Sequence, residues 1–374
     1  MTTYDAVIVG ARCAGAATAM LLARRGLKVL VLERDRPGTD TLSTHALMRG
    51  GVVQLRRWGL LDRVVEAGTP PIRHTVFHYG DERVTVSVKP AAGVDALYAP
   101  RRTVLDRILV DAAIAAGAEV RFGMDVTGLV RHPDGQVGGV VARDRRGRTS
   151  VTKAQITIGA DGARSLVARE VAAPALHTGE GTGAVVYGYW RGLDVTGYEW
   201  YYRPGMTAGL IPTNDGEVCV FAGAPTPRFR REVDGDLAAW YLRTLKEVTG
   251  ADPRLDGGPR RLRTHVGRYG QVRHPWGPGW ALVGDAGHVV DPLSTHGITD
   301  ALRDAELLSQ AVLAGGDDAM PGYQQARDRA AGPMFAAIDR IAGYGWTLPE
   351  VRRLLMELSS AMSDEVETLS GLVV

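Results

Sequence analysis

The sequence predicts an α/β fold in which a domain built on a parallel sheet is interrupted by an antiparallel sheet and followed by helices. Three observations predict it: a strand-helix-strand pattern at the amino terminus, two later strands that each run into a glycine-containing turn, and short alternating strands between them. The chain has 374 residues, of which 45% are hydrophobic and 23% charged, so it is long enough for two ordinary domains with buried cores.

Composition excludes several classes of protein. Lys+Arg number 44 and Asp+Glu 42, and the net charge of +2 gives no electrostatic case for nucleic acid as a partner. The two cysteines, Cys13 and Cys219, cannot form a disulfide framework, and no Cys/His cluster has the spacing of a metal site. The amino terminus lacks the basic segment of a signal peptide, and no apolar run approaches the ~20 residues of a membrane span. We therefore expect a cytoplasmic protein without a metal.

The first elements are a buried strand, a helix and a second buried strand. The strand covers Asp5–Val9, the alanine- and leucine-rich helix covers Ala14–Arg25, and the second strand covers Lys28–Leu32. Gly26 follows the helix, where glycine is a common stop signal. The three elements predict the first β-α-β unit of a parallel sheet.

The turn of this unit has the spacing of a dinucleotide-binding fingerprint. Gly10 permits the tight turn, Gly15 permits close packing of helix on strand, and Glu33 ends the second strand as an acceptor for ribose hydroxyls. Free N–H groups at the helix start favour a pyrophosphate. Arg12 replaces the usual middle glycine, and we expect its guanidinium to pair with the pyrophosphate. A glycine-rich turn alone can be purely structural, but the whole pattern favours a Rossmann-like domain.

Two later strands carry further motifs. Gln155–Ile158 is followed by Asp161, Gly162 and Ser165, and Trp280–Val283 is followed by Gly284, Asp285 and Pro292. With the first turn, these motifs resemble the class A FAD-dependent monooxygenases of the para-hydroxybenzoate hydroxylase type, which have relatives among geranylgeranyl reductases and flavin halogenases. In that family the first motif binds the ADP half of FAD, the second contributes to FAD and NAD(P)H binding, and the third holds the ribityl chain.

The resemblance implies a set of cofactor contacts. They are Gly10, Arg12, Cys13, Ala14, Gly15, Glu33, Arg34, Arg101, Val126, Asp161, Gly284, Asp285, Pro292, Gly297 and Ile298. Gly297 and Ile298 open a helix predicted at Thr299–Leu313, whose positive end would favour reduced flavin. The family position at Arg101 opens another helix, running to about Ala116. We expect Arg101 to contact FAD and Arg102 to face solvent.

Two histidines are candidate catalytic residues. His45 lies in the segment Asp35–Gly51, which in the family wraps beside the isoalloxazine, and His296 precedes the helix just described. Both stand in the tripeptide Ser-Thr-His. Histidine can exchange a proton near neutral pH, which suits a general acid or base. The alternative, which we favour slightly for each, is a hydrogen-bonded structural histidine.

An antiparallel sheet that binds substrate is predicted from two segments. Thr75–Val88 and Gly183–Arg273 contain short alternating strands, and the second includes a helix at Leu237–Val248. Aromatic residues concentrate in it, and Tyr189 and Tyr201 are the candidates for contact with substrate. Since strand residues alternate between faces, several of these aromatic side chains must instead belong to the core.

The predicted domain boundaries follow from these elements. The FAD-binding domain comprises residues 1–71, 99–175 and 276–320, and the substrate sheet comprises residues 72–98 and 176–275. Residues 321–374 form a helical segment with breaks at Gly332–Pro333 and around Gly343–Pro349, which could cap the fold or serve a homo-oligomer.

The leading interpretation of function is an FAD-dependent monooxygenase. NAD(P)H would bind transiently and reduce the flavin, O₂ would form a C4a-(hydro)peroxyflavin, and a small hydrophobic or aromatic molecule would receive one oxygen atom. The alternative is a reductase of the geranylgeranyl reductase type. A flavin halogenase is less favoured because Leu210-Ile211-Pro212 lacks the tryptophans of the usual signature. A nicotinamide-only dehydrogenase stays open as a different class.

Overall fold

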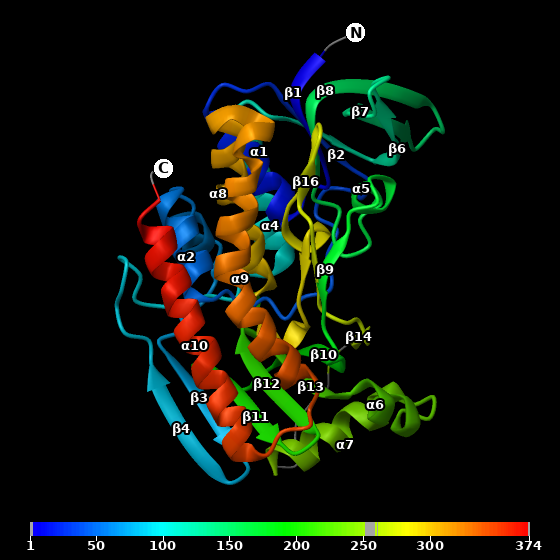
Figure 1. Cartoon of the computed structure of the whole chain (residues 1–374). Coiled ribbons are helices and arrows are strands. Elements are labelled where there is room, and N and C mark those ends of the chain that lie inside the picture. Colours follow the sequence, from blue (N-terminus) through cyan, green and yellow to red (C-terminus); the bar gives the residue numbers. More distant parts are fainter. Residues whose placement is uncertain (1–2, 251–258, 260, 373–374) are drawn as a thin grey trace.

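A computed structural model describes residues 3–250, 259 and 261–372 of the chain. The predicted domains also included residues 1–2, 251–258, 260 and 373–374, which lie outside the described residues. Figure 1 shows a parallel-sheet region at the top, an antiparallel sheet at the bottom, and long helices that run between them. The predicted fold class is confirmed, whereas the exact domain boundaries stay a prediction.

The upper region is built on an eight-stranded sheet in which β16-β17-β8-β1-β2-β5 lie side by side. At its centre are β1 (Thr3–Val9), β2 (Val29–Glu33), β8 (Thr149–Gly159) and β17 (Trp280–Leu282), which pair in parallel. The other strands are β5 (Glu119–Phe122), β6 (Met124–Arg131), β7 (Val137–Asp144) and β16 (Trp276–Gly277). Strands β6 and β7 continue from β8 as an antiparallel ribbon.

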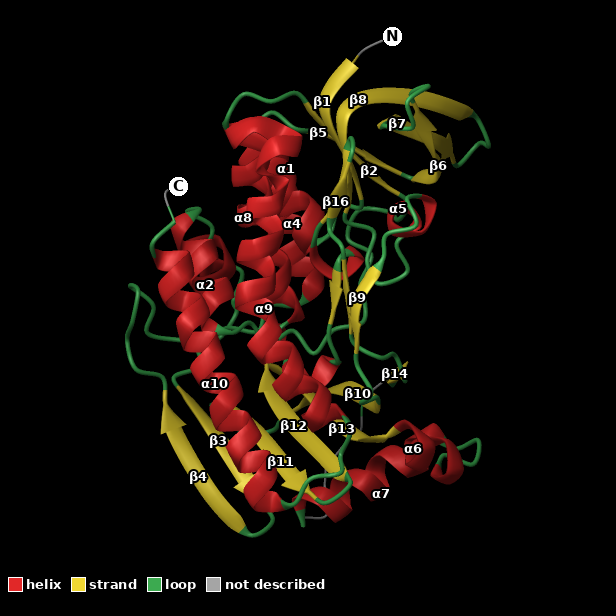
Figure 2. Ribbon diagram, viewed as in Figure 1, coloured by secondary structure: helices red, strands yellow, loops and turns green. Residues whose placement is uncertain are grey.

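Both faces of this sheet are covered, which explains the continuous apolar runs of its central strands. Helices α1 (Cys13–Arg24), α4 (Arg102–Ala115) and α8 (Gly297–Gly315) pack together on one face, as Figure 2 shows. The ribbon of β6 and β7, with the short helix α5 (Leu166–Glu170), covers the other. Because β1, β8 and β17 run in parallel, the turns that follow them meet at one edge of the sheet.

The lower region is a seven-stranded sheet in the order β14-β10-β13-β12-β11-β3-β4. Its strands are β3 (His74–Tyr79), β4 (Glu82–Ser87), β10 (Gly183–Arg191), β11 (Tyr198–Arg203), β12 (Met206–Pro212), β13 (Glu217–Pro225) and β14 (Arg263–Val266). All neighbours are antiparallel except β11 and β3. Helices α6 (Thr226–Glu232) and α7 (Leu237–Thr249) follow β13, and α7 packs on β11, β12 and β13.

Smaller elements connect the two regions. A three-stranded sheet contains β9 (Ala175–Thr178), β15 (Gln271–Arg273) and β18 (His288–Val289). Helices α2 (Arg49–Arg57) and α3 (Leu61–Glu66) follow the loop after β2, and α2 packs against α8. The chain therefore passes between the two large sheets several times.

The carboxy-terminal segment forms two helices, α9 (Met320–Ala342) and α10 (Leu348–Ser370). The predicted break at Gly332–Pro333 is wrong, because α9 continues through Pro333. A proline inside a helix costs ~3 kcal/mol, and here the packing of α9 against both α8 and α10 outweighs that cost. The chain does break after Gly343, and Thr347 then starts α10 with a capping box that includes Glu350.

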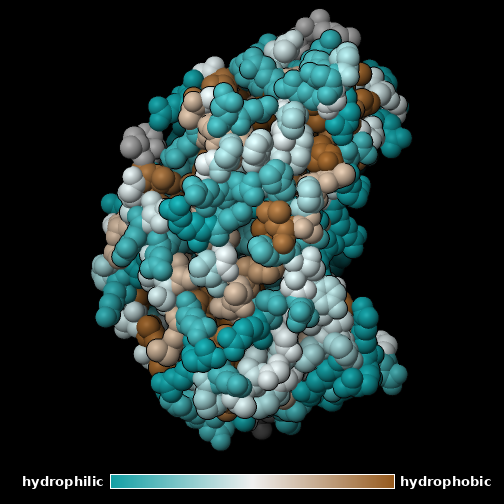
Figure 3. Space-filling view, in the orientation of Figure 1, coloured by the Kyte–Doolittle hydropathy of each residue, from teal (hydrophilic) through white to brown (hydrophobic). Residues whose placement is uncertain are grey.

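The surface gives no sign of a membrane span. Within residues 3–250, 259 and 261–372, no helix is both long enough and apolar enough to cross a bilayer. Figure 3 shows a face that is mostly hydrophilic, with small hydrophobic patches scattered over it, one of them near its middle.

Candidate active site

The turn after β1 is closed too tightly for any side chain at its two glycines. Gly10 has φ +103°, and a Cβ atom there would lie 2.5 Å from the carbonyl oxygen of Ala160. A Cβ atom at Gly15 would lie 1.9 Å from the carbonyl oxygen of Gly10. Strand β1, helix α1 and the turn after β8 are therefore in direct backbone contact, as the fingerprint requires.

Helix α1 begins in this turn without a side-chain cap. Arg12 is the N-cap residue, and its side chain makes no capping hydrogen bond. Cys13 and Ala14 in the first turn are buried, and a buried helix end normally finds partners for its free N–H groups. Glu33 supports the turn instead of the helix, because its carboxylate accepts hydrogen bonds from the N–H groups of Ala11 (2.8 Å) and Asp35 (2.9 Å). The N–H groups in the first turn of α1 have no capping side chain and are able to donate hydrogen bonds to an anion.

The guanidinium of Arg12 forms ion pairs with two carboxylates of the chain. Its guanidinium lies 3.0 Å from Asp35 and 3.2 Å from Asp106. The thiol of Cys13 donates a hydrogen bond to the same Asp106 at 3.1 Å. The predicted pairing of Arg12 with a pyrophosphate would therefore have to compete with these ion pairs.

The expectation that Arg102 faces solvent at the start of α4 is wrong. Arg102, predicted to face solvent, is only 12% exposed at its side chain and pairs with Asp106 beside α1. Arg101 turns the other way, to Glu217 (2.7 Å) and Asp40 (3.6 Å) on the side of the antiparallel sheet. The spacing of Arg102 and Asp106, four residues apart on one helix, was the signal in the sequence.

The turn after β17 places Asp285 where it is accessible and yet surrounded by protein. Its side chain is exposed to solvent, and desolvation by the surrounding protein, opposed by Arg102, raises the pKa of its carboxyl to about 6. Asp285 therefore has protein close around it while its side chain stays accessible to solvent. Gly284 (φ +59°) brings this turn against α1, where an added Cβ atom would lie 2.9 Å from the Cβ atom of Ala14.

The start of α8 faces open space. A Cβ atom added to Gly297 would meet nothing within 4 Å, and no side chain caps the helix. Ile298 is buried, and Pro292 opens a 3₁₀ turn whose N-cap residue, Asp291, bonds to the N–H of Leu293. Helix α8 is therefore, like α1, a helix whose uncapped N–H groups at this edge are able to donate hydrogen bonds to a ligand.

Three further predicted contacts differ in their surroundings. Asp161 accepts a hydrogen bond from the N–H of Leu166, the first residue of α5, at 2.6 Å, and its other oxygen is buried without a partner among the described residues. Val126 is buried on β6, and Arg34 is exposed after β2. The closed glycine turn, the buried uncapped start of α1, the accessible carboxylate of Asp285 and the open start of α8 together fit an extended dinucleotide.

His45 lies between this edge and the antiparallel sheet. It is buried, has φ 70°, and its Nε2 is hydrogen-bonded to the hydroxyl of Tyr189 on β10. Burial, together with Arg101 and other nearby arginines, holds the pKa of His45 well below its usual value. Burial also raises the pKa of Tyr189, so both groups are neutral at pH 7. Nδ1 of His45 is buried without a partner among the described residues.

Ion pairs hold the loop of His45 on the sheet. Asp40 of the loop lies 2.6 Å from Arg263 on β14 and 3.6 Å from Arg101. The guanidinium carbon of Arg101 sits 3.7 Å above the ring centre of Tyr189. The N–H of Ser43 donates to the hydroxyl of Tyr187 at 2.9 Å. This face of the sheet is therefore polar as well as aromatic.

Tyr201 lies on the opposite face of the antiparallel sheet from Tyr189. The strand register pairs Tyr189 with Cys219, Cys219 with Ile211, and Glu199 with Leu210, so Tyr189 and Glu199 fall on opposite faces of the sheet. Tyr201 shares the face of Glu199, donates a hydrogen bond to it at 2.5 Å, and stacks on His78. Register across strands therefore places the two substrate candidates on opposite faces, so Tyr189 and Tyr201 cannot line one pocket together.

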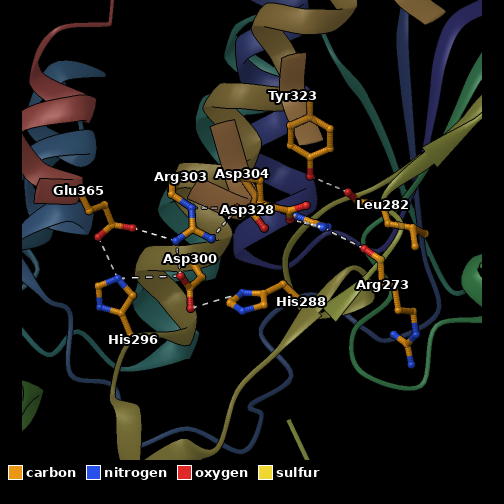
Figure 4. Close-up of polar contacts among 11 residues, drawn as sticks. Arg273, Leu282, His288, His296, Asp300, Arg303, Asp304, Tyr323, Asp328 and Glu365 are labelled. Carbon is orange, nitrogen blue, oxygen red and sulfur yellow. Dashed lines mark hydrogen bonds and ion pairs between the residues drawn. The ribbon is translucent and has the colours of Figure 1, made fainter. Parts of the chain in front are cut away.

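His296 belongs to a buried network of charges rather than to the open edge (Figure 4). Its Nε2 lies 2.8 Å from Glu365 of α10 and 3.9 Å from Asp300 of α8. Arg303 lies 2.9 Å from Glu365, 2.5 Å from Asp300 and 2.7 Å from Asp304. His296, Asp300 and Glu365 are close enough to bind a metal ion together, but Arg303 already bonds to both carboxylates. We interpret the cluster as an internal ion-pair network.

His288 at the margin of this network should make stability depend on pH. Burial lowers the pKa of His288 to about 4, whereas a histidine in the unfolded chain has a pKa near 6.5. Between these two pH values the unfolded chain therefore binds a proton that the folded chain does not bind. The contribution of His288 to the free energy of unfolding therefore falls as pH drops from ~6.5 to ~4, by up to about 1.4 kcal/mol per pH unit. We expect His288→Leu to lose this slope relative to the unmodified protein in urea unfolding at pH 7, 6 and 5. Parallel curves for the two proteins would contradict the burial of a neutral His288.

Comparison with protein families identifies the dinucleotide that this kind of domain binds. The family model described as FAD binding domain matches residues 3–332. The chain belongs to this FAD-binding family. The resemblance inferred from the three motifs is thereby confirmed, and the chain is an FAD-dependent oxidoreductase.

Relatives within the FAD-binding family differ in their reactions. The chain is 30% identical over 333 residues to the menaquinone reductase of Mycolicibacterium smegmatis, covering 84% of this chain and 78% of the relative. It is 28% identical over 359 residues to the kynurenine 3-monooxygenase of Salinispora arenicola, covering 86% and 75%. The myxobacterial chondrochloren halogenase superposes with a TM-score of 0.79 at 23% identity, covering 90% and 82%, which shows the shared fold.

Proposed function

We propose that this member of the FAD-binding family is a monooxygenase that uses NAD(P)H and O₂ to oxygenate a small aromatic molecule with a polar substituent. The observation that carries the proposal is the buried face around Tyr189, where a tyrosine hydroxyl, an imidazole and ion-paired arginines lie together. Such a face offers hydrogen bonds and ring contacts to a polar aromatic molecule. Bound FAD would supply the electrons and the activation of oxygen.

The residues of the chain would have separate tasks. The first turn of α1 would hold the pyrophosphate, Asp285 the ribityl hydroxyls, and the start of α8 the pyrimidine edge of FAD. Tyr189 and His45 share one proton between the phenol oxygen and Nε2. With the hydroxyl of Tyr189 donating to Nε2, Nδ1 of His45 carries a proton that has no partner among the described residues. The pair could pass a proton to or from a substrate hydroxyl.

A reductase of prenyl chains is the second candidate. The 30% identity to a menaquinone reductase favours it. The face of β10 toward His45 favours the monooxygenase, because the hydroxyl of Tyr189, the imidazole of His45 and the ion-paired arginines make it polar, whereas a long prenyl chain is bound best by an apolar surface.

Isotopically labelled oxygen separates the two reactions. The FAD-loaded protein would be incubated with NADH or NADPH, a panel of phenolic and aminobenzoyl compounds, and ¹⁸O₂. A monooxygenase yields a product that contains one ¹⁸O atom, with NAD(P)H oxidation accelerated by the substrate. Saturation of a prenyl quinone under argon, without incorporation of oxygen from ¹⁸O₂, would reject the monooxygenase and establish the reductase.

Tyr189→Phe should slow turnover without loss of FAD. It removes the hydroxyl that bonds to His45 and keeps the ring beneath Arg101, so we expect kcat to fall ~100-fold, the lower range for general acid-base catalysis. Steady-state kinetics between pH 6 and 9 measure the effect. Tyr201→Phe is the matched control on the opposite face, where we expect less than a twofold change. Equal effects of the two substitutions would refute the role of Tyr189.

A further inference from the structure

Two residues of the loop between β2 and α2 are bonded to two tyrosines of β10 at equal spacing. The N–H of Ser43 donates to the hydroxyl of Tyr187 at 2.9 Å, and Nε2 of His45 is hydrogen-bonded to the hydroxyl of Tyr189. Tyr187 and Tyr189 lie two residues apart on one strand, so their side chains project from the same face of the sheet. Their rings meet edge to face, with ring centres 6.0 Å apart. The loop therefore runs along this face, with Ser43 at Tyr187 and His45 at Tyr189.

The backbone of His45 has a conformation that needs support from its surroundings. Its φ of 70° lies in the left-handed region, which a residue other than glycine keeps only where the structure around it holds it there. The N–H of His45 donates to Oγ of Ser43 at 3.0 Å. Two residues after His45, the N–H of Leu47 donates to the carbonyl oxygen of Tyr98 at 2.9 Å. His45 therefore lies between two anchored residues, Leu47 on one side and Ser43, which is bonded to Tyr187, on the other.

The second Ser-Thr-His tripeptide, Ser294-Thr295-His296, adopts a different conformation. The N–H of His296 donates to Oγ of Ser294 at 3.1 Å, as in the first tripeptide. Here, however, the positive φ of 51° falls on Thr295, and His296 has φ −106°. The bond within the tripeptide therefore does not determine the conformation of His45. Contacts from outside the tripeptide determine it, and Tyr187 provides one of them.

The pKa of His45 reports whether the loop lies on the sheet. Burial holds this pKa well below its usual value, and the nearby cations add to the effect: Arg101, Arg102 and Arg263. Burial raises the pKa of Tyr187 to about 12, so its hydroxyl is uncharged at pH 7 and accepts the N–H of Ser43. Tyr189 is uncharged for the same reason. If the loop moved away from β10, water would reach the imidazole and the pKa of His45 would rise toward 6.5.

We propose that Tyr187 is a positioning residue whose hydroxyl, through Ser43, holds His45 against Tyr189. The inference rests on the proposed function, in which His45 and Tyr189 pass a proton to or from the substrate. Such a pair must be held in place before the reaction, because small displacements of reacting groups cost large factors in rate. Tyr187 acts on the reaction only through the loop and exchanges no proton itself.

The titration of His45 in the FAD-loaded protein tests this inference. The protein would carry ¹³C-labelled histidine, and His45→Gln would identify the signal of His45 among the nine histidines in nuclear magnetic resonance spectra. We expect Tyr187→Phe to raise the midpoint of the His45 titration toward its usual value. Tyr241→Phe is the matched control, since it removes another buried tyrosine hydroxyl, bonded to Val220 on the opposite face of the sheet, and should leave the midpoint unchanged.

Steady-state kinetics test whether Tyr187 acts through the pair. We expect Tyr187→Phe to lower kcat about fivefold, the effect of losing one hydrogen bond, and to change KM less than about twofold. In a Tyr189→Phe background the same substitution should cause no further loss, because the pair that Tyr187 positions is already broken. A fivefold loss in both backgrounds would show that Tyr187 acts independently of the pair and would overturn the inference.

The outcomes separate the inference from the proposed function. An unchanged titration of His45 in Tyr187→Phe would overturn the inference and leave the proposed oxygenation standing. A raised midpoint, combined with no ¹⁸O in any product, would support the anchoring of His45 and reject the oxygenation. If Tyr187→Phe does not fold, Ser43→Ala decides, because it removes the Oγ that bonds to the N–H of His45 and should also raise the midpoint. Ser43→Thr keeps a hydroxyl and should restore the titration of the unmodified protein.

Discussion

Gly15→Ala is expected to abolish retention of FAD. The new methyl group would lie 1.9 Å from the carbonyl oxygen of Gly10, so the turn between β1 and α1 must open. Overpacking of a closed site typically costs ~1–3 kcal/mol, and a contact as short as this one belongs at the upper end of that range. If that cost falls on the binding-competent turn, affinity for FAD drops at least ~100-fold. The ratio of flavin to protein after gel filtration, read from visible absorbance, gives the result.

Gly322→Ala is the control for this change. Gly322 lies in α9, where an added Cβ atom meets nothing within 4 Å, and alanine favours a helix over glycine. We expect full retention of FAD and equal or slightly greater stability. Retention of FAD by Gly15→Ala at the level of this control would contradict the account of the turn.

Arg303→Leu should be the most destabilising single substitution in the buried network. Arg303 is 1% exposed and bonds to Asp300, Asp304 and Glu365, so its loss leaves three buried carboxylates with His296 as their remaining close cation. Removal of one partner from a buried ion pair costs ~3–5 kcal/mol. Urea unfolding followed by circular dichroism measures the loss in free energy of unfolding.

Two further variants make this result specific. Arg303→Lys keeps the charge but loses the planar guanidinium, and should fall between the unmodified protein and Arg303→Leu. Arg353→Leu removes one partner of an exposed pair with Glu357 and should change stability by less than about 1 kcal/mol. A loss for Arg303→Leu no larger than for Arg353→Leu would show that the network does not stabilise the fold.

The parallel-sheet region could be predicted because its signals are local. The runs that form β1 and β2 are buried on both faces, and Gly10 and Gly15 mark a turn whose geometry only glycine permits. The start of helix α4 was located by its arginines. The direction of the Arg102 side chain depends on Asp106, which is close in sequence, whereas that of Arg101 depends on Asp40, which is far away in sequence. Local spacing therefore predicted the elements better than the direction of their side chains.

Long-range partners escaped prediction. His296 was recognised as a candidate, but its partner Glu365 is 69 residues away on a helix whose exact course the sequence did not define. Alternation along β11 cannot tell on which face of the sheet Tyr201 lies, because the pairing between strands decides it. Pro333 signalled a break, and packing of α9 on two other helices overrode it.

The position of β8 at the centre of the parallel sheet has a consequence for synthesis of the chain. Residues Thr3–Val9 pair with Lys153–Gly159, and β8 in turn pairs with Trp280–Leu282. On the ribosome, β1 must wait for some 150 residues before β8, its neighbour opposite β2, emerges, and β8 must wait for about 120 more before β17 emerges. Such non-local pairing slows folding and leaves apolar strands uncovered meanwhile. Nascent chains arrested before Leu282 should therefore depend on chaperones for solubility, whereas longer ones can bury their strands.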